Sequence, residues 1–171
     1  MSLIFDEESV ASCWNEVMEL AQGHWAGTKT YRRHQPFVPS FERYEQANRT
    51  GFFRLFTARD QGKLVGYFGM YLTLSMHSQL PLAVEDTFYL HPDARKGRNA
   101  IRFIRFIEDT LRRVGIVELM FSCEVENPVA RKLLEYLDYR PVIVQCSKYL
   151  SSPPGADSTV TAVTECVDVC T

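Results

Sequence analysis

The sequence predicts an α/β (α+β) fold in which helices flank one mixed central sheet with antiparallel N-terminal strands. Three observations predict it: β-rich runs alternate with amphipathic helical stretches, the first two runs are joined by the short turn "DQGK", and 46% of the 171 residues are hydrophobic. A chain of this length and apolar content can bury one sizeable core. We therefore expect a single domain over residues 1–150 and a flexible Ser-, Pro-, Gly- and Thr-rich tail over 151–171.

Two helices are predicted before the first strand. Apolar residues recur at helical spacing over residues 7–22, and Gly23 stands where that helix would end. Residues 24–40 have no periodicity and are interpreted as a loop. Ser40 is then a suitable N-cap for a short helix at 41–48.

The middle of the chain predicts strands followed by a helix. Residues 51–75 contain two β-rich runs around a turn, which is typical of an antiparallel hairpin. The run "LAVEDTFYL" at 82–90 predicts another strand, and it enters the turn "LHPDARKGRNA" at 90–100. Apolar residues then recur at helical spacing over 99–114, where i,i+4 pairs of opposite charge favour a helix.

The last elements alternate again. "IVELMFSCEV" at 116–125 alternates apolar and polar residues and predicts a strand. Residues 128–137 predict a helix, and "RPVIVQCSKYL" at 140–150 predicts the final strand.

Charge and hydropathy exclude several classes of protein. A net charge of −2 means that any binding of nucleic acid must come from a local basic patch, and no reading motif accompanies one. No run approaches the length of a membrane span, and the first residues lack the pattern of a signal peptide. We therefore expect a cytoplasmic protein that binds neither membrane nor nucleic acid.

The cysteines indicate a reduced protein without a metal. Cys13, Cys123 and Cys146 fall within apolar patterns and are interpreted as small core residues. Cys166 and Cys170 have metal-ligand spacing, but no second pair or histidine lies near them in the sequence, so a metal site is the weaker interpretation.

The turn at 90–100 has the composition of an anion site. A strand that ends in a loop at the start of a helix directs unpaired backbone N–H groups toward an anion. Gly97 permits close approach of the backbone, and Arg95, Lys96 and Arg98 add positive charge. A phosphate or pyrophosphate is the functional interpretation of the turn, and an ordinary solvated loop is the alternative.

The succession of these elements, with "VEDTFYLHPDARKGRNAIRFI" and "ENPVARKLLEYLDYRPV", resembles the GNAT superfamily of acetyl-CoA-dependent N-acetyltransferases over about residues 5–150. The resemblance implies acetyl-CoA as cosubstrate and two parallel strands, here 83–90 and 117–125, that splay apart around its pantetheine arm. Arg95 and Ala100 match the ends of the family's pyrophosphate loop, whereas Arg98 occupies its main glycine position. The arrangement resembles a variant that occurs in phage-encoded members.

Further site residues follow from this resemblance. The six residues expected at the pyrophosphate are Arg95, Lys96, Gly97, Arg98, Asn99 and Ala100. Asn127 resembles the family residue whose amide contacts pantetheine, although an Asn before a Pro is also a suitable helix cap. Leu134 stands where the family often has a tyrosine that protonates the leaving thiolate. Tyr136 is the candidate replacement, with Tyr139 as a second; core packing is the alternative for both.

The strand at 82–90 holds the candidate groups for the acetyl transfer itself. By resemblance, the backbone N–H of Tyr89 or Leu90 polarises the thioester carbonyl. A lysine-like amine has a pKa of about 10 and must lose a proton before it attacks, so a carboxylate base is useful. Alternation places Glu85 and Asp86 on opposite faces, and we favour Glu85 because Asp86 shares the parity of apolar residues such as Phe88. A β-bulge would reverse this assignment.

The resemblance implies transfer of an acetyl group to a primary amine of a small molecule or a protein. His91 is a further candidate base, although packing against the loop is more usual for such a histidine. The aromatic and basic segment at 24–37 is expected to wall the acceptor site, with a solvated loop as the alternative. A non-catalytic acyl-CoA-binding protein of the same fold is the second hypothesis, and assembly as a homodimer is left open.

Overall fold

The computed structural model describes residues 3–27, 36–146, 148 and 150. The helices and strands, in chain order, are β1 (Ile4–Glu8), α1 (Val10–Gly27), α2 (Phe41–Arg49), β2 (Phe53–Asp60), β3 (Lys63–Leu74), β4 (Pro81–Leu90), the 3-10 helix η2 (Pro92–Arg95), α3 (Asn99–Arg113), β5 (Glu118–Met120) and α4 (Pro128–Tyr136). The predicted tail at 151–171 lies outside the described residues, and the domain limits 1–150 stay a prediction.

The described strands form one mixed sheet in the order β1-β2-β3-β4-β5. Neighbouring strands pair antiparallel from β1 to β4, whereas β4 and β5 are parallel. This arrangement confirms the predicted mixed sheet and its antiparallel N-terminal part.

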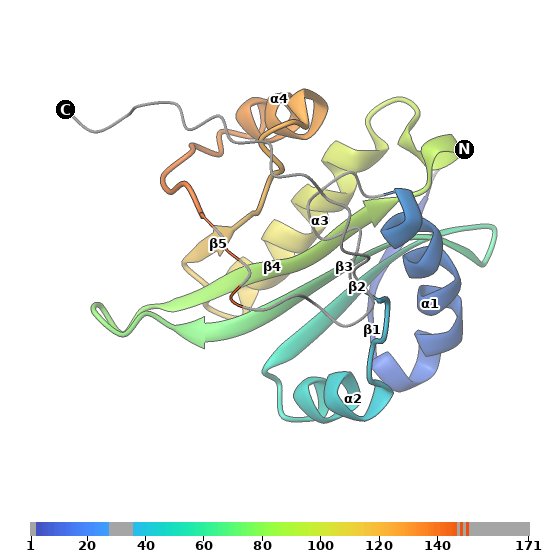
Figure 1. Cartoon of the computed structure of the whole chain (residues 1–171), viewed down its shortest axis with the longest axis horizontal. Coiled ribbons are helices and arrows are strands. Elements are labelled where there is room, and N and C mark those ends of the chain that lie inside the picture. The colour runs from blue at the N-terminus through green and yellow to red at the C-terminus, as the bar shows by residue number, and fades with distance from the viewer. Residues whose placement is uncertain (1–2, 28–35, 147, 149, 151–171) are drawn as a thin grey trace.

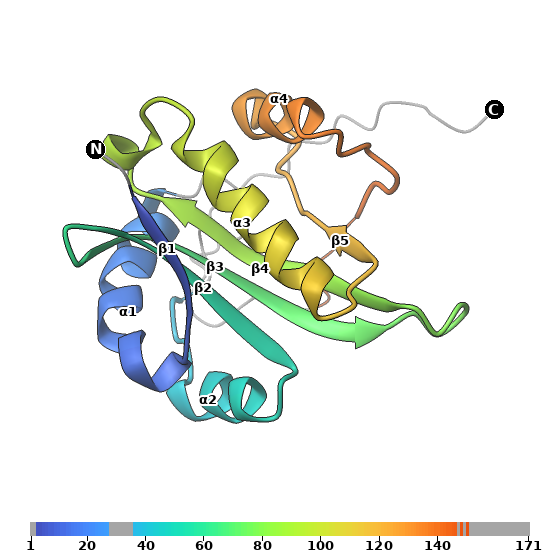
Figure 2. The same ribbon diagram turned by 180° about the vertical axis from the view of Figure 1, so that it is seen from behind.

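Helices cover both faces of the sheet (Figures 1 and 2). α1 and α2 lie on one face, and α3 crosses the other. On the α3 face the core includes Phe56, Phe68 and Phe103, all fully buried. On the α1 face it includes Val10 and Cys13 together with aromatic residues of β2 and β3. The protein therefore has two apolar core layers, one on each face of the sheet.

The helices end close to their predicted limits, with one exception. Ser40 caps α2 as expected, because its hydroxyl accepts from the Arg43 N–H at 3.4 Å. The limits of α3 and α4 agree with the predicted ranges to within about one residue, which is the usual uncertainty of helix ends. α1, however, begins at Val10 and not at residue 7, because residues 7 and 8 belong to β1, and it continues to Gly27, so residues 24–27 are helical and not part of a loop.

Strand β1 is absent from the sequence-based prediction. Its five residues "IFDEE" contain three acids and lie mostly exposed at the sheet edge, so they have neither the composition nor the burial of a typical strand. Charge complementarity explains the pairing with β2. Arg54 forms two hydrogen bonds with Glu7, and the guanidinium of Arg59 contacts Glu8 at 2.7 Å.

Two predictions about the C-terminal half are wrong. β5 has three residues and not ten, because the chain after Met120 leaves the sheet although β4 continues to Leu90. Of residues 140–150, the described ones form no strand, although Val142, Ile143 and Val144 have high strand propensity and lie about three-quarters exposed.

The three cysteines predicted to be core residues differ in burial. Cys13 is buried as predicted, whereas Cys123 is partly exposed and Cys146 is exposed, so the prediction is wrong for the last two.

Candidate active site

The parallel strands β4 and β5 separate part-way along their length. Their ladder joins Leu82–Val84 to Glu118–Met120 and ends there. β4 continues to Leu90, whereas the chain after Met120 leaves the sheet toward α4 (Figure 1). The splayed pair predicted for 83–90 and 117–125 is therefore present. Beyond the ladder, a gap in the backbone pairing separates residues 85–90 from the 121–127 segment, and the rings of Phe88 and Phe121, 6.2 Å apart, meet across it.

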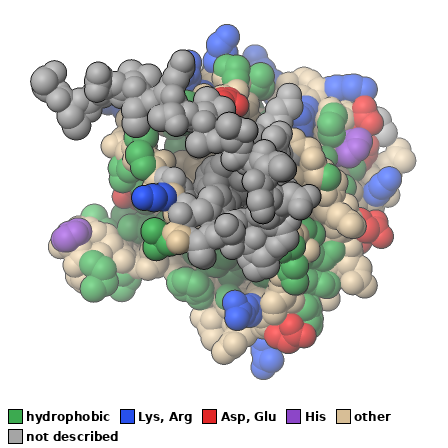
Figure 3. Space-filling view, in the orientation of Figure 1, with side chains coloured by type: hydrophobic (Ala, Val, Ile, Leu, Met, Phe, Trp, Pro, Cys, Tyr) green, Lys and Arg blue, Asp and Glu red, His purple; other side chains and the backbone are tan. Residues whose placement is uncertain are grey.

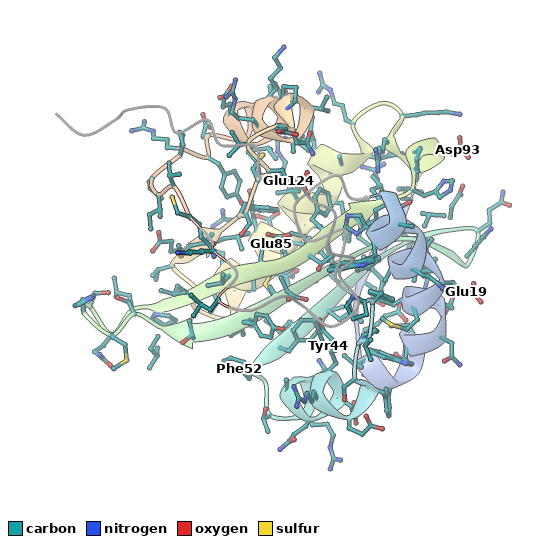
Figure 4. All side chains as sticks on the ribbon, in the orientation of Figure 1. Glu19, Tyr44, Phe52, Glu85, Asp93 and Glu124 are labelled. Carbon is teal, nitrogen blue, oxygen red and sulfur yellow. The ribbon has the colours of Figure 1, made fainter. Side chains whose placement is uncertain are left out.

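Glu85 bridges this gap. Its Oε2 oxygen accepts a hydrogen bond from the backbone N–H of Ser122 at 3.0 Å. Burial raises the pKa of the Glu85 carboxyl to about 7, the Ser122 N–H opposes that rise, and the negative charge of Asp86 adds to it. Figure 4 labels Glu85 on β4 near the centre of the molecule and Glu124 on the segment after β5. A carboxyl with this pKa exchanges a proton readily near neutral pH.

A β-bulge separates Glu85 from Asp86. Gly69 of β3 pairs with Thr87 and Met70 pairs with Glu85, so Asp86 is the extra residue on β4. Residues paired directly across antiparallel strands share a face, and Met70 belongs to the core on the α3 side. Glu85 therefore starts from the α3 face, and Asp86 is turned to the face of α1 and α2. The opposite placement of the two acids is confirmed, but the parity argument that favoured Glu85 is wrong.

Asp86 lies among tyrosines. The Tyr44 hydroxyl, from α2, donates to the Asp86 Oδ2 oxygen at 3.1 Å. Burial raises the pKa of Tyr44 and of Tyr71, and the charge of Asp86 raises both further. Both phenols consequently stay protonated near neutral pH and act as hydrogen-bond donors.

Side chains of the turn between β4 and α3 form hydrogen bonds with the backbone of the same segment. The Nε of Arg95 donates to the Leu90 carbonyl oxygen at 2.7 Å, and its guanidinium lies 5.8 Å from the centre of the Tyr89 ring. The Asn99 side chain donates to the Ala94 carbonyl oxygen at 3.0 Å. Gly97 has φ +64°, a conformation that glycine adopts without strain, and a Cβ placed there would meet no described atom within 4 Å.

The N-terminus of α3 faces this turn. Arg98 is its N-cap residue and makes no side-chain capping bond, so the first N–H groups of the helix have no cap from that side chain. Lys96 and Arg98 are exposed, and Ala100 packs against the core on the α3 side. Lys and Arg side chains are visible along the upper edge of the molecule in Figure 3, the edge at which Figure 1 places α4 and this turn. The local geometry fits an anion.

A family model decides the identity of the fold. The model of the acetyltransferase (GNAT) family matches residues 14–139, which is most of the chain. The chain belongs to the GNAT family of acetyltransferases. The predicted resemblance is confirmed at the level of the superfamily.

Solved structures share this GNAT fold. An aminoglycoside acetyltransferase from an uncultured soil metagenomic sample, in complex with sisomicin, superposes with a TM-score of 0.72 at 14% identity, covering 87% of this chain and 97% of that one. Ribosomal-protein-alanine N-acetyltransferase from Brucella melitensis biovar Abortus 2308 gives 0.65 at 18% identity, with 89% and 99% covered. Glucosamine-6-phosphate N-acetyltransferase from Arabidopsis thaliana gives 0.64 at 15% identity, with 88% and 100% covered. No curated protein matches the sequence.

The two site residues expected after β5, Asn127 and Leu134, lie at the start and in the body of α4. Asn127 caps α4, because its Oδ1 oxygen accepts from the Ala130 N–H at 3.0 Å. This confirms the cap and leaves the pantetheine contact a prediction. Leu134 is partly buried on α4. Its side chain cannot donate a proton, and its correspondence to the usual GNAT tyrosine stays a prediction.

The two tyrosines near Leu134 differ. Tyr136 is 58% exposed, so core packing, the alternative interpretation, is wrong for it. Tyr139 instead donates to Glu108 at 2.8 Å and packs edge-on against Phe121. Burial and that hydrogen bond raise the pKa of Tyr139. Tyr139 is consequently engaged in joining α4 to α3, and Tyr136 stays the candidate acid.

Two histidines, His91 and His24, contact the end of β4 or the turn that follows it. The Nδ1 of His91 accepts from the Asp93 N–H at 3.3 Å and caps η2, and a role for His91 as a base stays a prediction. His24 lies 3.2 Å from the Tyr67 hydroxyl and stacks on Tyr89 at 4.7 Å. Sequence reasoning missed His24 because it assigned residues 24–40 to a loop. A helix extended by about one turn beyond Gly23 would have placed it beside the sheet.

Two further classes of site are not found in the described part of the chain. No group of His, Cys, Asp or Glu there has the arrangement of a metal site. Among the same residues, no helix has both the length and the hydropathy of a membrane span. The candidate metal pair Cys166 and Cys170 and residues 28–35 of the expected acceptor wall lie outside the described residues.

Proposed function

We propose that this protein transfers the acetyl group of acetyl-CoA to a primary amine of a small molecule or a protein. The observation that carries the proposal is Glu85, a carboxyl with a pKa of about 7 that directly follows the last pair of the β4–β5 ladder and accepts from Ser122. The structural neighbours named above include enzymes for an aminoglycoside, a protein alanine and an amino sugar phosphate, all of them amine acceptors.

The turn residues fit the pyrophosphate of acetyl-CoA. Gly97 leaves open space at a left-handed backbone position, and the first N–H groups of α3 lie beside it. Lys96, Arg98 and the backbone of Asn99 and Ala100 supply positive charge and donors. Arg95, tied to Leu90, holds the turn in shape. A CoA thioester supplies an activated acetyl group and a thiolate leaving group.

The chain's own groups then carry out the proton transfers. The backbone N–H of Tyr89 or Leu90 polarises the thioester carbonyl, and Asn127 holds the pantetheine arm. Glu85 takes the proton from the attacking ammonium, directly or through water, so that the amine nitrogen bonds to the acetyl carbon. The bond from that carbon to sulfur breaks, and Tyr136 donates its proton to the thiolate. The second proton that the nitrogen loses after attack passes through water and restores the Tyr136 hydroxyl.

A direct assay tests this proposal against a non-catalytic CoA-binding protein of the same fold, which Leu134 favours. Purified protein with acetyl-CoA is screened against amines and peptides while free thiol is measured. Release of free thiol together with formation of an acetylated amine supports the proposed acetyl transfer. Binding of acetyl-CoA without thiol release by any acceptor would favour the binding protein. The cytoplasmic location and the homodimer stay expectations.

Acetyl-CoA is expected to raise the melting temperature of the protein. A ligand that binds only the folded state stabilises it by about 2.7 kcal/mol at a hundred times its Kd. Thermal denaturation with and without excess acetyl-CoA or CoA measures the shift. An unchanged melting temperature with both compounds would contradict cofactor binding at the turn.

Leu134→Tyr is expected to increase turnover by several-fold if the reaction lacks an efficient thiolate acid. General acid catalysis contributes about a hundred-fold or more where the acid is well placed. If Tyr136 already serves, Leu134→Tyr gains little and Tyr136→Phe loses activity. Steady-state kinetics of both variants decide between the two. Unchanged turnover in both would show that water protonates the thiolate.

A further inference from the structure

The side of Asp86 that faces α1 and α2 is lined by aromatic rings. Tyr44 packs edge-on against Phe53 at 5.0 Å, and Phe53 lies 5.3 Å from Tyr71. Farther along the same face, Tyr67 lies 5.9 Å from Tyr89. Figure 4 shows Tyr44 reaching from α2 toward the sheet.

The bulge and a glycine give Asp86 its place among these rings. Because Asp86 is the extra residue of the bulge, its carboxylate leaves the β4 ladder on the face of α1 and α2. Gly69 lies opposite on β3, and a Cβ there would sit 3.6 Å from the Asp86 Oδ2 oxygen and 2.7 Å from the Phe53 ring. The absent side chain at Gly69 thus leaves the carboxylate room beside Phe53.

A carboxylate among phenol rings attracts an alkyl ammonium. The charge attracts the cation directly, ring faces add a cation–π contribution, and rings pack against the alkyl chain. The raised pKa values of Tyr44 and Tyr71 keep both phenols neutral, so no second anion forms there.

We propose that Asp86 and the rings of Tyr44 and Tyr71 bind a second ammonium group of the acceptor, which makes the acceptor a small polyamine. This inference rests on the proposed function, since the other amine of the same molecule must meet acetyl-CoA beside Glu85. The bulge turns two consecutive carboxylates to opposite faces. Among the described residues no strand pairs with this edge of β4 beyond Val84, so one molecule can reach both carboxylates around the edge, with the reacting amine at Glu85 and a second charge at Asp86.

Matched amines test the second charge. Putrescine has two amines, butylamine lacks the second, and aminobutanol replaces it with a neutral hydroxyl. We expect kcat/KM for putrescine to exceed the values for butylamine and aminobutanol by about ten-fold to a hundred-fold, the range of one charged hydrogen bond. Asp86→Asn should bring the putrescine-to-butylamine ratio to within about three-fold of one. A ratio near one in the unmodified protein, with acetyl transfer taking place, overturns the inference.

A matched control separates local from global charge. Glu19 is exposed on α1 (Figure 4), and Glu19→Gln removes one negative charge away from the tyrosines. It should keep the putrescine preference, and loss of the preference in both variants contradicts a site at Asp86. Asp86→Asn should also keep the thermal shift with acetyl-CoA, which a misfolded variant would lose. Should that variant fail to fold, salt gives a second measurement: added NaCl should lower the putrescine-to-butylamine ratio but not the aminobutanol-to-butylamine ratio.

Calorimetric titration keeps this inference distinct from the proposed function. The CoA-saturated protein is titrated with putrescine and with butylamine, which needs no turnover. If putrescine binds more tightly than butylamine and Asp86→Asn abolishes the difference, the site at Asp86 is supported. If no amine is acetylated in that case, only the proposed function is contradicted. Equal binding of both amines contradicts the site. Lysine-containing peptides complete the panel, and a peptide acetylated more efficiently than every polyamine would overturn the small-molecule assignment.

Discussion

Glu85→Gln is expected to lower turnover by about ten-fold to a thousand-fold near neutral pH, because the variant cannot accept a proton from the attacking ammonium. Glutamine keeps the length of the side chain, and its Oε1 oxygen still accepts from the Ser122 N–H. Acetyl-CoA affinity should stay nearly unchanged, since the lost group serves the acceptor. Steady-state kinetics with a confirmed acceptor, together with a titration of acetyl-CoA, measure both quantities.

The pH profile gives this prediction a second readout. The pKa of Glu85 is raised to about 7 by burial, so the base is protonated below that pH and kcat/KM should rise as pH increases through it. Glu85→Gln should lose this rise. The difference between the two proteins should shrink at alkaline pH, where more of the acceptor amine is already neutral. Full activity of the variant near neutral pH would make Asp86 or unassisted attack the better account.

Stability provides the control for folding. The folded-state pKa of Glu85 lies above the usual value for a glutamate, so the folded protein binds more protons than the unfolded chain between about 4.5 and 7. Stability from this group is present at low pH and is lost as pH rises through about 7. Glutamine never ionises, so Glu85→Gln should melt no lower than the unmodified protein at alkaline pH. A large drop in melting temperature would mean that lost activity reports misfolding.

The parts of the site that depend on local sequence could be predicted. The strand, turn and helix around Gly97 lie within one short segment, and its glycine, proline and basic residues have local physical meaning. The separation of β4 from β5 followed from the family resemblance. The cap at Asn127 followed from an Asn before a Pro. These features needed no knowledge of which strands become neighbours.

The parts that depend on pairing could not be predicted. The bulge at Asp86 arises from the register between β3 and β4, and a single extra residue reversed the faces inferred from alternation. β1 forms because its acids meet Arg54 and Arg59 across the ladder, a match invisible within "IFDEE". The tyrosines around Asp86 come from α2 and β3. Single-strand periodicity contains no signal for such a cluster.

Gly97→Glu is expected to abolish the thermal shift produced by acetyl-CoA. The new carboxylate would enter the open space beside the N-terminus of α3, where the pyrophosphate is proposed to lie, and would repel it. Replacing one Arg or Lys of the turn would remove one attraction to the pyrophosphate, whereas Gly97→Glu adds both a negative charge and a bulky side chain at its proposed position. We expect the Kd for acetyl-CoA to rise by about a hundred-fold or more, which corresponds to about 2.7 kcal/mol.

Gly97→Gln is the matched control for backbone strain. The φ of +64° at Gly97 penalises any side chain by about 1–2 kcal/mol, so both variants should melt at a similar, slightly lower temperature without ligand. Glutamine has the shape of glutamate without its charge, and it should keep part of the acetyl-CoA shift. A larger loss of affinity with Glu than with Gln assigns the difference to repulsion of an anion. Equal shifts in both variants and the unmodified protein would place the pyrophosphate away from Gly97, and the turn would then be the solvated loop that its composition also allows.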